Sequence, residues 1–121
     1  MRLTRGAVVT ASIGGTSGKP RPFLVLRSNH FAEHSLVTLL AFTSTLTDAP
    51  TLRVAVQPSP DNGLKMPSQA MIDQVQSVRV QRIERTFGRL ADADRAAITR
   101  ALSVYLGLAD TGSPRRKRAA A

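Results

Sequence analysis

The chain has 121 residues, which leaves room for one hydrophobic core and excludes a separate cofactor-binding domain. It contains no cysteine, so disulfides, a thiol nucleophile and thiolate zinc sites are excluded as well. Seventeen Lys and Arg residues against eight Asp and Glu give a formal net charge of +9, and this excess favours a polyanionic partner, either nucleic acid or an acidic protein segment.

Neither a membrane segment nor an export signal is apparent. The longest apolar run lies around residues 36–42, well short of the ~18–20 residues that a span needs. The N-terminus lacks the apolar region of a signal peptide, so we expect a cytoplasmic protein with no membrane partner. Residues 1–108 are predicted to form the domain, and residues 109–121, with the basic run Arg115–Arg118, a disordered tail.

The first half of the chain predicts four strands. Residues 7–13 form the first, and a glycine-rich loop at residues 14–18 follows it. Residues 23–27 and 36–42 are continuously apolar, which predicts two strands covered on both faces. Residues 52–57 alternate between apolar and polar side chains, as a half-exposed strand does.

The second half predicts two more strands and a helix. A turn at residues 58–63 precedes a fifth strand at residues 68–75, and a short strand follows at residues 86–88. A helix is predicted from Asp92 to about Leu106, with Gly107 at its end. Its apolar stripe consists of Ala97, Ile98, Ala101, Leu102, Tyr105 and Leu106. Strands followed by one long helix indicate a mainly β (α+β) fold, an antiparallel sheet or small barrel with a packed helix.

Several familiar site patterns are excluded or weak. Residues 14–19 resemble a phosphate-binding loop, but Ile13 and Pro20 stand where that motif needs Gly and Ser or Thr. His30 and His34 lack a third metal ligand nearby. They remain candidates for an acid–base pair acting on a phosphodiester, although histidines in a polar loop are more often solvated bystanders. The aspartates are too scattered in sequence to indicate a metal cluster.

Arg21 is the strongest single candidate for a functional residue. It stands between Pro20 and Pro22, which give it a stiff, extended backbone at the start of a buried strand. A guanidinium held there suits a phosphate, and pairing with a carboxylate at the sheet rim is the alternative. The hydroxyl-rich run Thr43–Thr47 leaves the end of the third predicted strand, where it is either a phosphate-contacting edge or an ordinary loop.

These segments together resemble the MazF/PemK family of toxin endoribonucleases over roughly residues 5–108. No single motif is diagnostic, but the order and spacing of the set are specific. The segments are Arg5-Gly6, Gly18-Lys19-Pro20-Arg21-Pro22 leading into Phe23–Leu26, Leu40–Ser44, Gly63-Leu64, Pro67-Ser68, Asp73-Gln74-Val75, Gly88–Asp94 and Leu106-Gly107-Leu108.

The resemblance implies an SH3-like barrel with a C-terminal helix, assembled as a homodimer. It implies cleavage of single-stranded RNA at short motifs to 2′,3′-cyclic phosphate and 5′-hydroxyl ends, without metal or cofactor. It also implies neutralisation by an acidic antitoxin. Arg21 and Thr43 match the family's catalytic pair. The residues expected to contact RNA around this pair are Thr16, Ser17, Lys19, Arg27, Ser44, Thr45 and Gln74.

The chain departs from the family pattern at three places. Ala7 stands where an Asp is common, and the loop at residues 14–18 is short and has no acid. The general base is therefore unassigned, with Thr16, Ser17 or a histidine as replacements. Ala91 replaces a helix-capping Ser, which affects stability alone.

Two other functions remain open on the same fold. The first is a gyrase-binding toxin of the CcdB type, although residues 101–108 hold no poisoning determinants that we recognise. The second is a basic RNA-binding barrel, for which four Phe, one Tyr and no Trp offer few stacking platforms. Phe31 is the aromatic side chain that we expect to be exposed.

Overall fold

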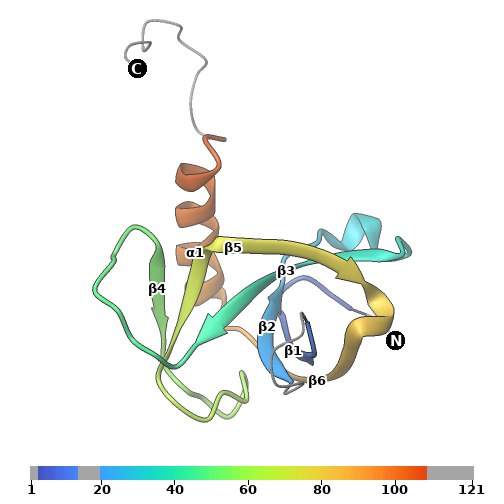
Figure 1. Cartoon of the computed structure of the whole chain (residues 1–121), viewed down its shortest axis with the longest axis horizontal. Coiled ribbons are helices and arrows are strands. Elements are labelled where there is room, and N and C mark those ends of the chain that lie inside the picture. The colour runs from blue at the N-terminus through green and yellow to red at the C-terminus, as the bar shows by residue number, and fades with distance from the viewer. Residues whose placement is uncertain (1–2, 14–19, 109–121) are drawn as a thin grey trace, which may run out of the picture.

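Six strands form one antiparallel sheet in the order β4-β5-β3-β2-β1-β6, and a C-terminal helix packs against it (Figure 1). The computed structural model describes residues 3–13 and 20–108. The elements are β1 (Ala7–Ala11), β2 (Arg21–Val25), β3 (Leu36–Thr43), β4 (Arg53–Val56), β5 (Ser68–Arg79), β6 (Ile83–Arg89) and α1 (Asp92–Tyr105), with 3₁₀ turns at Asn29–Phe31 and Val80–Arg82. The predicted mainly β fold with a C-terminal helix is confirmed. The predicted tail at residues 109–121 lies outside the described residues.

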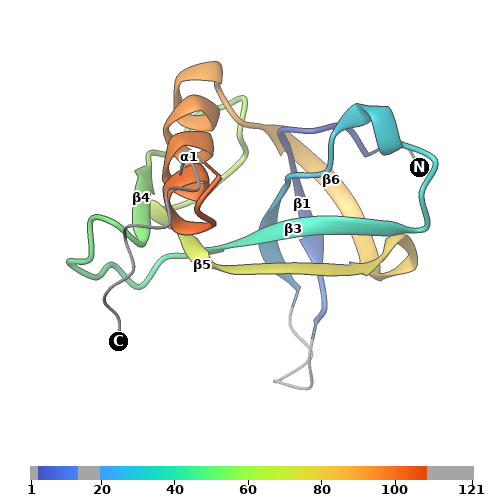
Figure 2. The same ribbon diagram turned by 90° about the horizontal axis from the view of Figure 1, so that it is seen from above.

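The central strands β2 and β3 are buried on both faces, as their continuous apolar runs predict. Alternate side chains of a strand point to opposite faces, so each strand feeds two separate cores. Leu24 and Leu40 join the cluster that includes Ile98 of α1, whereas Val25 and Leu39 join a second cluster on the other face. The sheet curls around this second cluster, while α1 covers the first (Figures 1 and 2).

Strand boundaries differ from prediction where polar residues continue a ladder. β5 runs on to Arg79 because it pairs along the whole of β3, from Thr43↔Gln69 to Leu36↔Arg79. β2 begins at Arg21 because this residue pairs with Ala11 of β1. Pairing with an adjacent strand sets the end of β5 and the start of β2, and local composition does not reveal this pairing.

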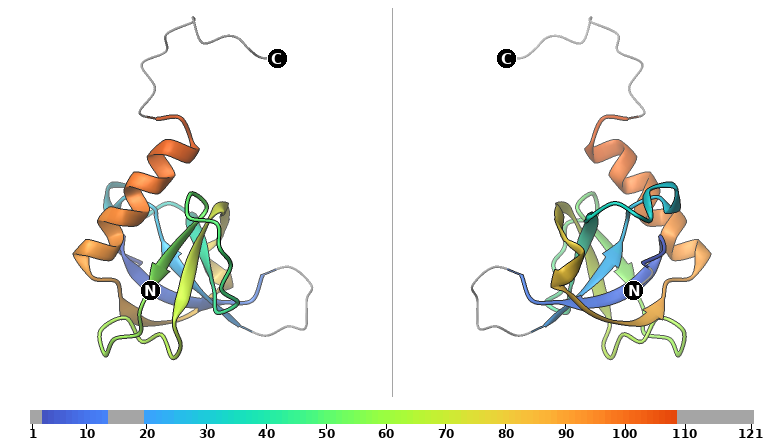
Figure 3. Two further views of the ribbon diagram at one scale, coloured as in Figure 1. Left: turned by 90° about the vertical axis from the view of Figure 1, so that its left-hand side faces the viewer. Right: turned by 90° about the vertical axis from the view of Figure 1, so that its right-hand side faces the viewer.

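The bounds of the predicted helix are confirmed, but its apolar stripe is buried only in part. Ile98 and Leu102 are buried against the sheet, but Tyr105 and Leu106 of the predicted stripe are 49% and 52% exposed. The reason is that α1 extends past the strands that it covers (Figure 3). Gly107, at φ +72°, ends the helix as predicted. No helix in the described ranges is long and apolar enough to cross a membrane.

Candidate functional site

Arg21 and Thr43 lie at the same end of the β2–β3 ladder. The two strands pair antiparallel, with Phe23 opposite Ala41 and Leu24 opposite Leu40. Extending this register by two residues brings Arg21 opposite Thr43, with both side chains on one face of the sheet. Two residues separated by 21 intervening positions in the sequence are therefore cross-strand neighbours.

Arg21 is an exposed cation at the start of β2. Within the described part of the chain its guanidinium forms no hydrogen bond and no ion pair, so the alternative of a rim salt bridge does not hold there. Its backbone is held by the ladder to Ala11 and by the flanking prolines. The backbone of Arg21 is thus held in place, while the N–H donors of its guanidinium remain available to an anion.

Thr43 is half-buried at the end of β3. Its hydroxyl oxygen accepts a hydrogen bond of 3.1 Å from the backbone N–H of Thr45. This bond leaves the hydroxyl hydrogen free to donate to a phosphate oxygen. Ser44 and Thr45 follow at the rim and are exposed, in keeping with their predicted place near the site.

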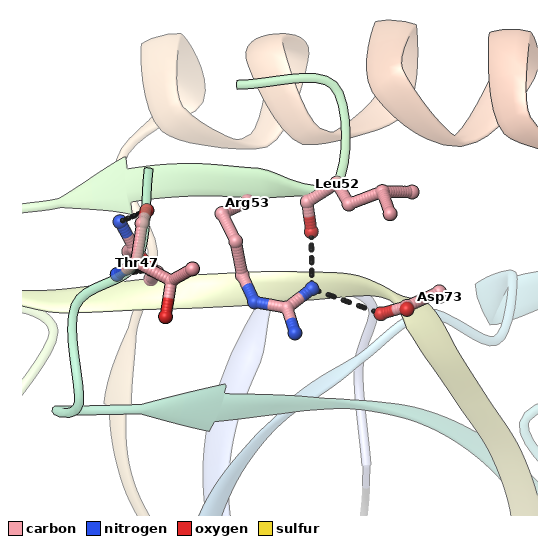
Figure 4. A network of polar contacts seen from close by, with 5 residues as sticks. Thr47, Leu52, Arg53 and Asp73 are labelled. Atoms are coloured by element: carbon pink, nitrogen blue, oxygen red, sulfur yellow. Dashed lines mark hydrogen bonds and ion pairs between the residues drawn. The ribbon is translucent and has the colours of Figure 1, made fainter. Parts of the chain in front are cut away.

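Gln69 fixes the loop that leaves the site. It lies opposite Thr43 on β5, and its side-chain amide brackets Thr47 of the β3–β4 connection. Its oxygen accepts from the Thr47 N–H at 3.1 Å and its nitrogen donates to the Thr47 carbonyl at 2.9 Å (Figure 4). Sequence reasoning did not single out Gln69, because the partner of Thr43 on β5 depends on the strand register.

A second link joins β4 and β5 on the same side of the molecule. Arg53 donates from Nη1 to the Leu52 carbonyl at 2.8 Å and to Asp73 Oδ1 at 2.9 Å (Figure 4). This carboxylate is therefore engaged within the sheet. Gln74, predicted to contact RNA, is exposed next to it, at a place where Val75 opposes Leu40. That is three residues along β3 from Thr43, roughly 10 Å away.

Arg27, predicted to contact RNA, is not brought together with Arg21 and Thr43 by the structure. It is 7% exposed and lies beyond the other end of β2, six residues or about 20 Å of strand from Arg21. Its guanidinium donates to four backbone carbonyls, at 2.9 Å for His34 and Leu36, 3.3 Å for Ala32 and 3.4 Å for Leu3. A guanidinium engaged in this way holds the connection between β2 and β3 in place.

His30 and His34 lie in that same connection, at the end of β2 away from Arg21. Within one chain they do not face the phosphate that Arg21 and Thr43 would hold. Phe31, 57% exposed as predicted, makes an edge contact with the His30 ring. Among the described residues no group of three or more His, Asp or Glu could hold a metal ion. Thr16, Ser17 and Lys19 lie outside the described residues.

The fold and Arg21 with Thr43, which we call the strand-end pair, define a class: a small, basic, mainly β protein with an arginine and a threonine opposite each other at the end of two strands. Residues 4–106 match the family described as PemK-like, MazF-like toxin of type II toxin-antitoxin system, and the chain belongs to this family. The predicted family resemblance is thereby confirmed.

Known relatives agree with this assignment. The chain is 41% identical over 108 residues to "Probable endoribonuclease MazF" of Mycolicibacterium smegmatis, covering 88% of this chain and 99% of the relative. Among solved structures, "Mycobacterium tuberculosis toxin MazF-mt6" is 26% identical, with a TM-score of 0.71 over 84% of this chain and 96% of that chain. An endoribonuclease "in complex with its cognate antitoxin from Mycobacterial species" shares the fold, with a TM-score of 0.72 at 24% identity over 87% and 95% of the two chains.

Proposed function

We propose that this chain is a toxin endoribonuclease that cleaves single-stranded RNA at short sequence motifs, without a metal ion, using Arg21 and Thr43. The observation that carries the proposal is the juxtaposition of Arg21, which has no ion-pair partner among the described residues, with Thr43 at one end of the β2–β3 ladder. The 41% identical relative named a probable endoribonuclease supports the same activity.

The proposed reaction is an internal transfer of the phosphate. The ribose 2′-hydroxyl attacks the adjacent phosphorus and the bond to the 5′-oxygen breaks, which leaves a 2′,3′-cyclic phosphate and a 5′-hydroxyl. The non-bridging oxygens gain negative charge on the way. The paired N–H donors of Arg21 match these oxygens, and their charge stabilises the transition state more than the ground state.

Thr43 supplies one further hydrogen bond to the phosphate, because its hydroxyl hydrogen is not used by the Thr45 turn. Arg21 is unsuited to accept the 2′-hydroxyl proton, since a guanidinium remains protonated in proteins. In the described part of the chain neither residue is bonded to a carboxylate or histidine. The proton acceptor therefore comes from outside this pair, and the two residues act by holding and stabilising the phosphate.

An acidic antitoxin is the proposed protein partner. The net charge of +9 favours an acidic segment, and a protein of the same fold was solved with its cognate antitoxin. The proposed homodimer follows from the family resemblance, and light scattering of the full chain tests it by reporting one or two copies.

Cleavage is tested by incubating the purified full chain with mixed-sequence RNA in EDTA and mapping the new 5′ ends. We expect defined cuts with 5′-hydroxyl ends. Arg21→Ala is expected to slow cleavage about 10²- to 10³-fold, as loss of a transition-state donor does. Thr43→Val removes the hydroxyl at constant shape, and we expect a loss of about 10-fold or more. Arg82→Ala, an exposed arginine on the turn before β6, is the matched control for charge.

Two results would contradict the proposal. RNA that is bound at full strength but left intact would indicate a plain RNA-binding protein. Equal loss of cleavage in Arg21→Ala and Arg82→Ala would mean that Arg21 adds only positive charge to the protein and makes no specific contact with the cleaved phosphate.

A further inference from the structure

A cavity of about 270 Å³ opens next to Arg21 on the side of the sheet that α1 covers. Its walls come from the ends of β1, β2, β3, β5 and β6 and from the β4–β5 connection. This volume is close to the lower end of small-molecule pockets, roughly 300–1,000 Å³. Arg21 lines the cavity and also belongs to the strand-end pair, and Ser44 in its wall directly follows Thr43.

The wall formed by the β4–β5 connection is held rigidly in place. Asn62 is 2% exposed, and its Oδ1 accepts from the N–H groups of Ser59 and Leu64 at 3.1 and 2.9 Å. Its Nδ2 donates to the Gln57 carbonyl at 2.9 Å. The connection is so close to β6 that a Cβ on Gly88 would stand 2.2 Å from the Asn62 carbonyl oxygen. This wall of the cavity is therefore fixed by its own contacts.

The lining combines an apolar floor with groups that donate hydrogen bonds. Pro22, Phe42 and Phe87 provide apolar surface, two of them with aromatic rings. Lys65 and Arg21 are cations that only donate. A flat ring with a polar edge fits such a lining, and donors at its edge match a base that presents carbonyl oxygens.

Two hydroxyls distinguish a nucleobase from an apolar protein side chain as the occupant. Thr10 and Ser44 line the cavity, and neither side chain makes a hydrogen bond within the described ranges. A hydrocarbon side chain would leave both hydroxyls without a partner, which is unfavourable once water is excluded. The edge of a base would supply partners to both.

We propose that this cavity binds the nucleobase next to the cleaved phosphate and selects uracil or guanine, which carry a carbonyl oxygen at the position where cytosine and adenine carry an amino group. This inference rests on the proposed function, because Arg21 must hold the scissile phosphate for the adjoining cavity to receive a neighbouring base. Catalysis and base choice are then assigned to different residues: Arg21 and Thr43 act on the phosphate, whereas Lys65 and Ser44 read the base.

The test compares cleavage rates of short single-stranded RNAs in which each position flanking the mapped cut is varied through all four bases. The full chain is compared with Lys65→Met, which removes the donor, and with Ser44→Leu, which fills the cavity from an exposed position. Arg82→Met is the matched control for the loss of a cation, and circular dichroism verifies that each variant is folded.

We expect the wild type to prefer uracil or guanine over cytosine and adenine at one flanking position, by about 5- to 150-fold, the range of one base-edge contact. Lys65→Met and Ser44→Leu should each lower that preference at least about fivefold and leave the other positions unchanged. Arg82→Met should keep the wild-type preference.

The inference is overturned if the wild type shows no such preference, or if both cavity variants retain it in full. It is also overturned if the variants keep the wild-type preference but lose binding to an acidic antitoxin peptide, since a protein segment would then be the occupant. Normal cleavage by Arg21→Ala is a separate result, which would contradict the proposed function itself.

Discussion

Arg27 is expected to stabilise the fold and to have no direct role in RNA binding, and Arg27→Met separates the two roles. The side chain is 7% exposed and donates two hydrogen bonds of 2.9 Å and two longer ones to backbone carbonyls. Methionine has a similar length and no donors, so the substitution removes these bonds while filling much of the same space.

The size of the effect follows from these contacts. Two short bonds from a charged donor contribute about 1.5–3 kcal/mol each, or about 3–6 kcal/mol together. The Arg27 Nε is buried without a partner, which offsets about 1–3 kcal/mol of this gain. We therefore expect Arg27→Met to lower the free energy of unfolding by about 3 kcal/mol, a large part of the 5–15 kcal/mol typical of a domain.

Urea unfolding followed by circular dichroism measures this change, and the midpoint should fall by about 1–3 M. Arg27→Lys keeps the charge, but an ammonium has its donors on one atom and cannot reach carbonyls on several sides. It should therefore be destabilised nearly as much, while Arg82→Met stays within about 0.5 kcal/mol of the wild type. At low temperature, where both Arg27 variants are more fully folded, their affinity for RNA should equal that of the wild type. An unchanged midpoint together with weakened RNA binding would refute the structural role.

Three further predictions concern local contacts. Gln69→Leu releases the loop beside the strand-end pair and should slow single-turnover cleavage about tenfold. The control Gln76→Leu, farther along β5, should cleave at the wild-type rate. Equal slowing in the two variants would contradict a positioning role for Gln69. Gly88→Ala should lower the free energy of unfolding by about 3 kcal/mol in urea melts, because the new Cβ would meet the Asn62 backbone at 2.2 Å; a stabilised variant would show that the close approach is absent. Ala91→Ser should raise the free energy of unfolding by about 1 kcal/mol, because Ala91 stands at the N-cap of α1 and its side chain forms no hydrogen bond there. An unchanged melting temperature would show that the serine hydroxyl does not cap the helix.

The elements were predictable because their signals are local. Continuous apolar runs indicated β2 and β3, and helical spacing indicated the start of α1 with Ile98 and Leu102 facing the core. The exposed Tyr105 has the same spacing. Its exposure depends on where the neighbouring strands end, which no local pattern encodes.

For the candidate site, the sequence singles out two residues that the structure brings together, and it does not reveal their surroundings. Arg21 stood out through its prolines, and the family resemblance singled out Thr43. Gln69 became relevant only through its pairing opposite Thr43, which requires the register of β5. Arginine commonly binds phosphate, and the sequence does not reveal the four carbonyls that surround the Arg27 guanidinium.

The strand-end pair and the cavity beside it differ in how they are held, and this difference bears on how such a protein could change its target. Arg21 and Thr43 belong to a ladder whose register positions every side chain of two buried strands, so moving them would disturb both cores. Lys65 lies outside the strands, on a connection fixed by Asn62 several residues earlier, and its side chain is exposed. Substitution at Lys65 or at the exposed Ser44 therefore alters the cavity lining without altering the ladder. On the proposed assignment, base preference changes by single substitutions in the lining while the strand-end pair and the stability of the domain stay the same.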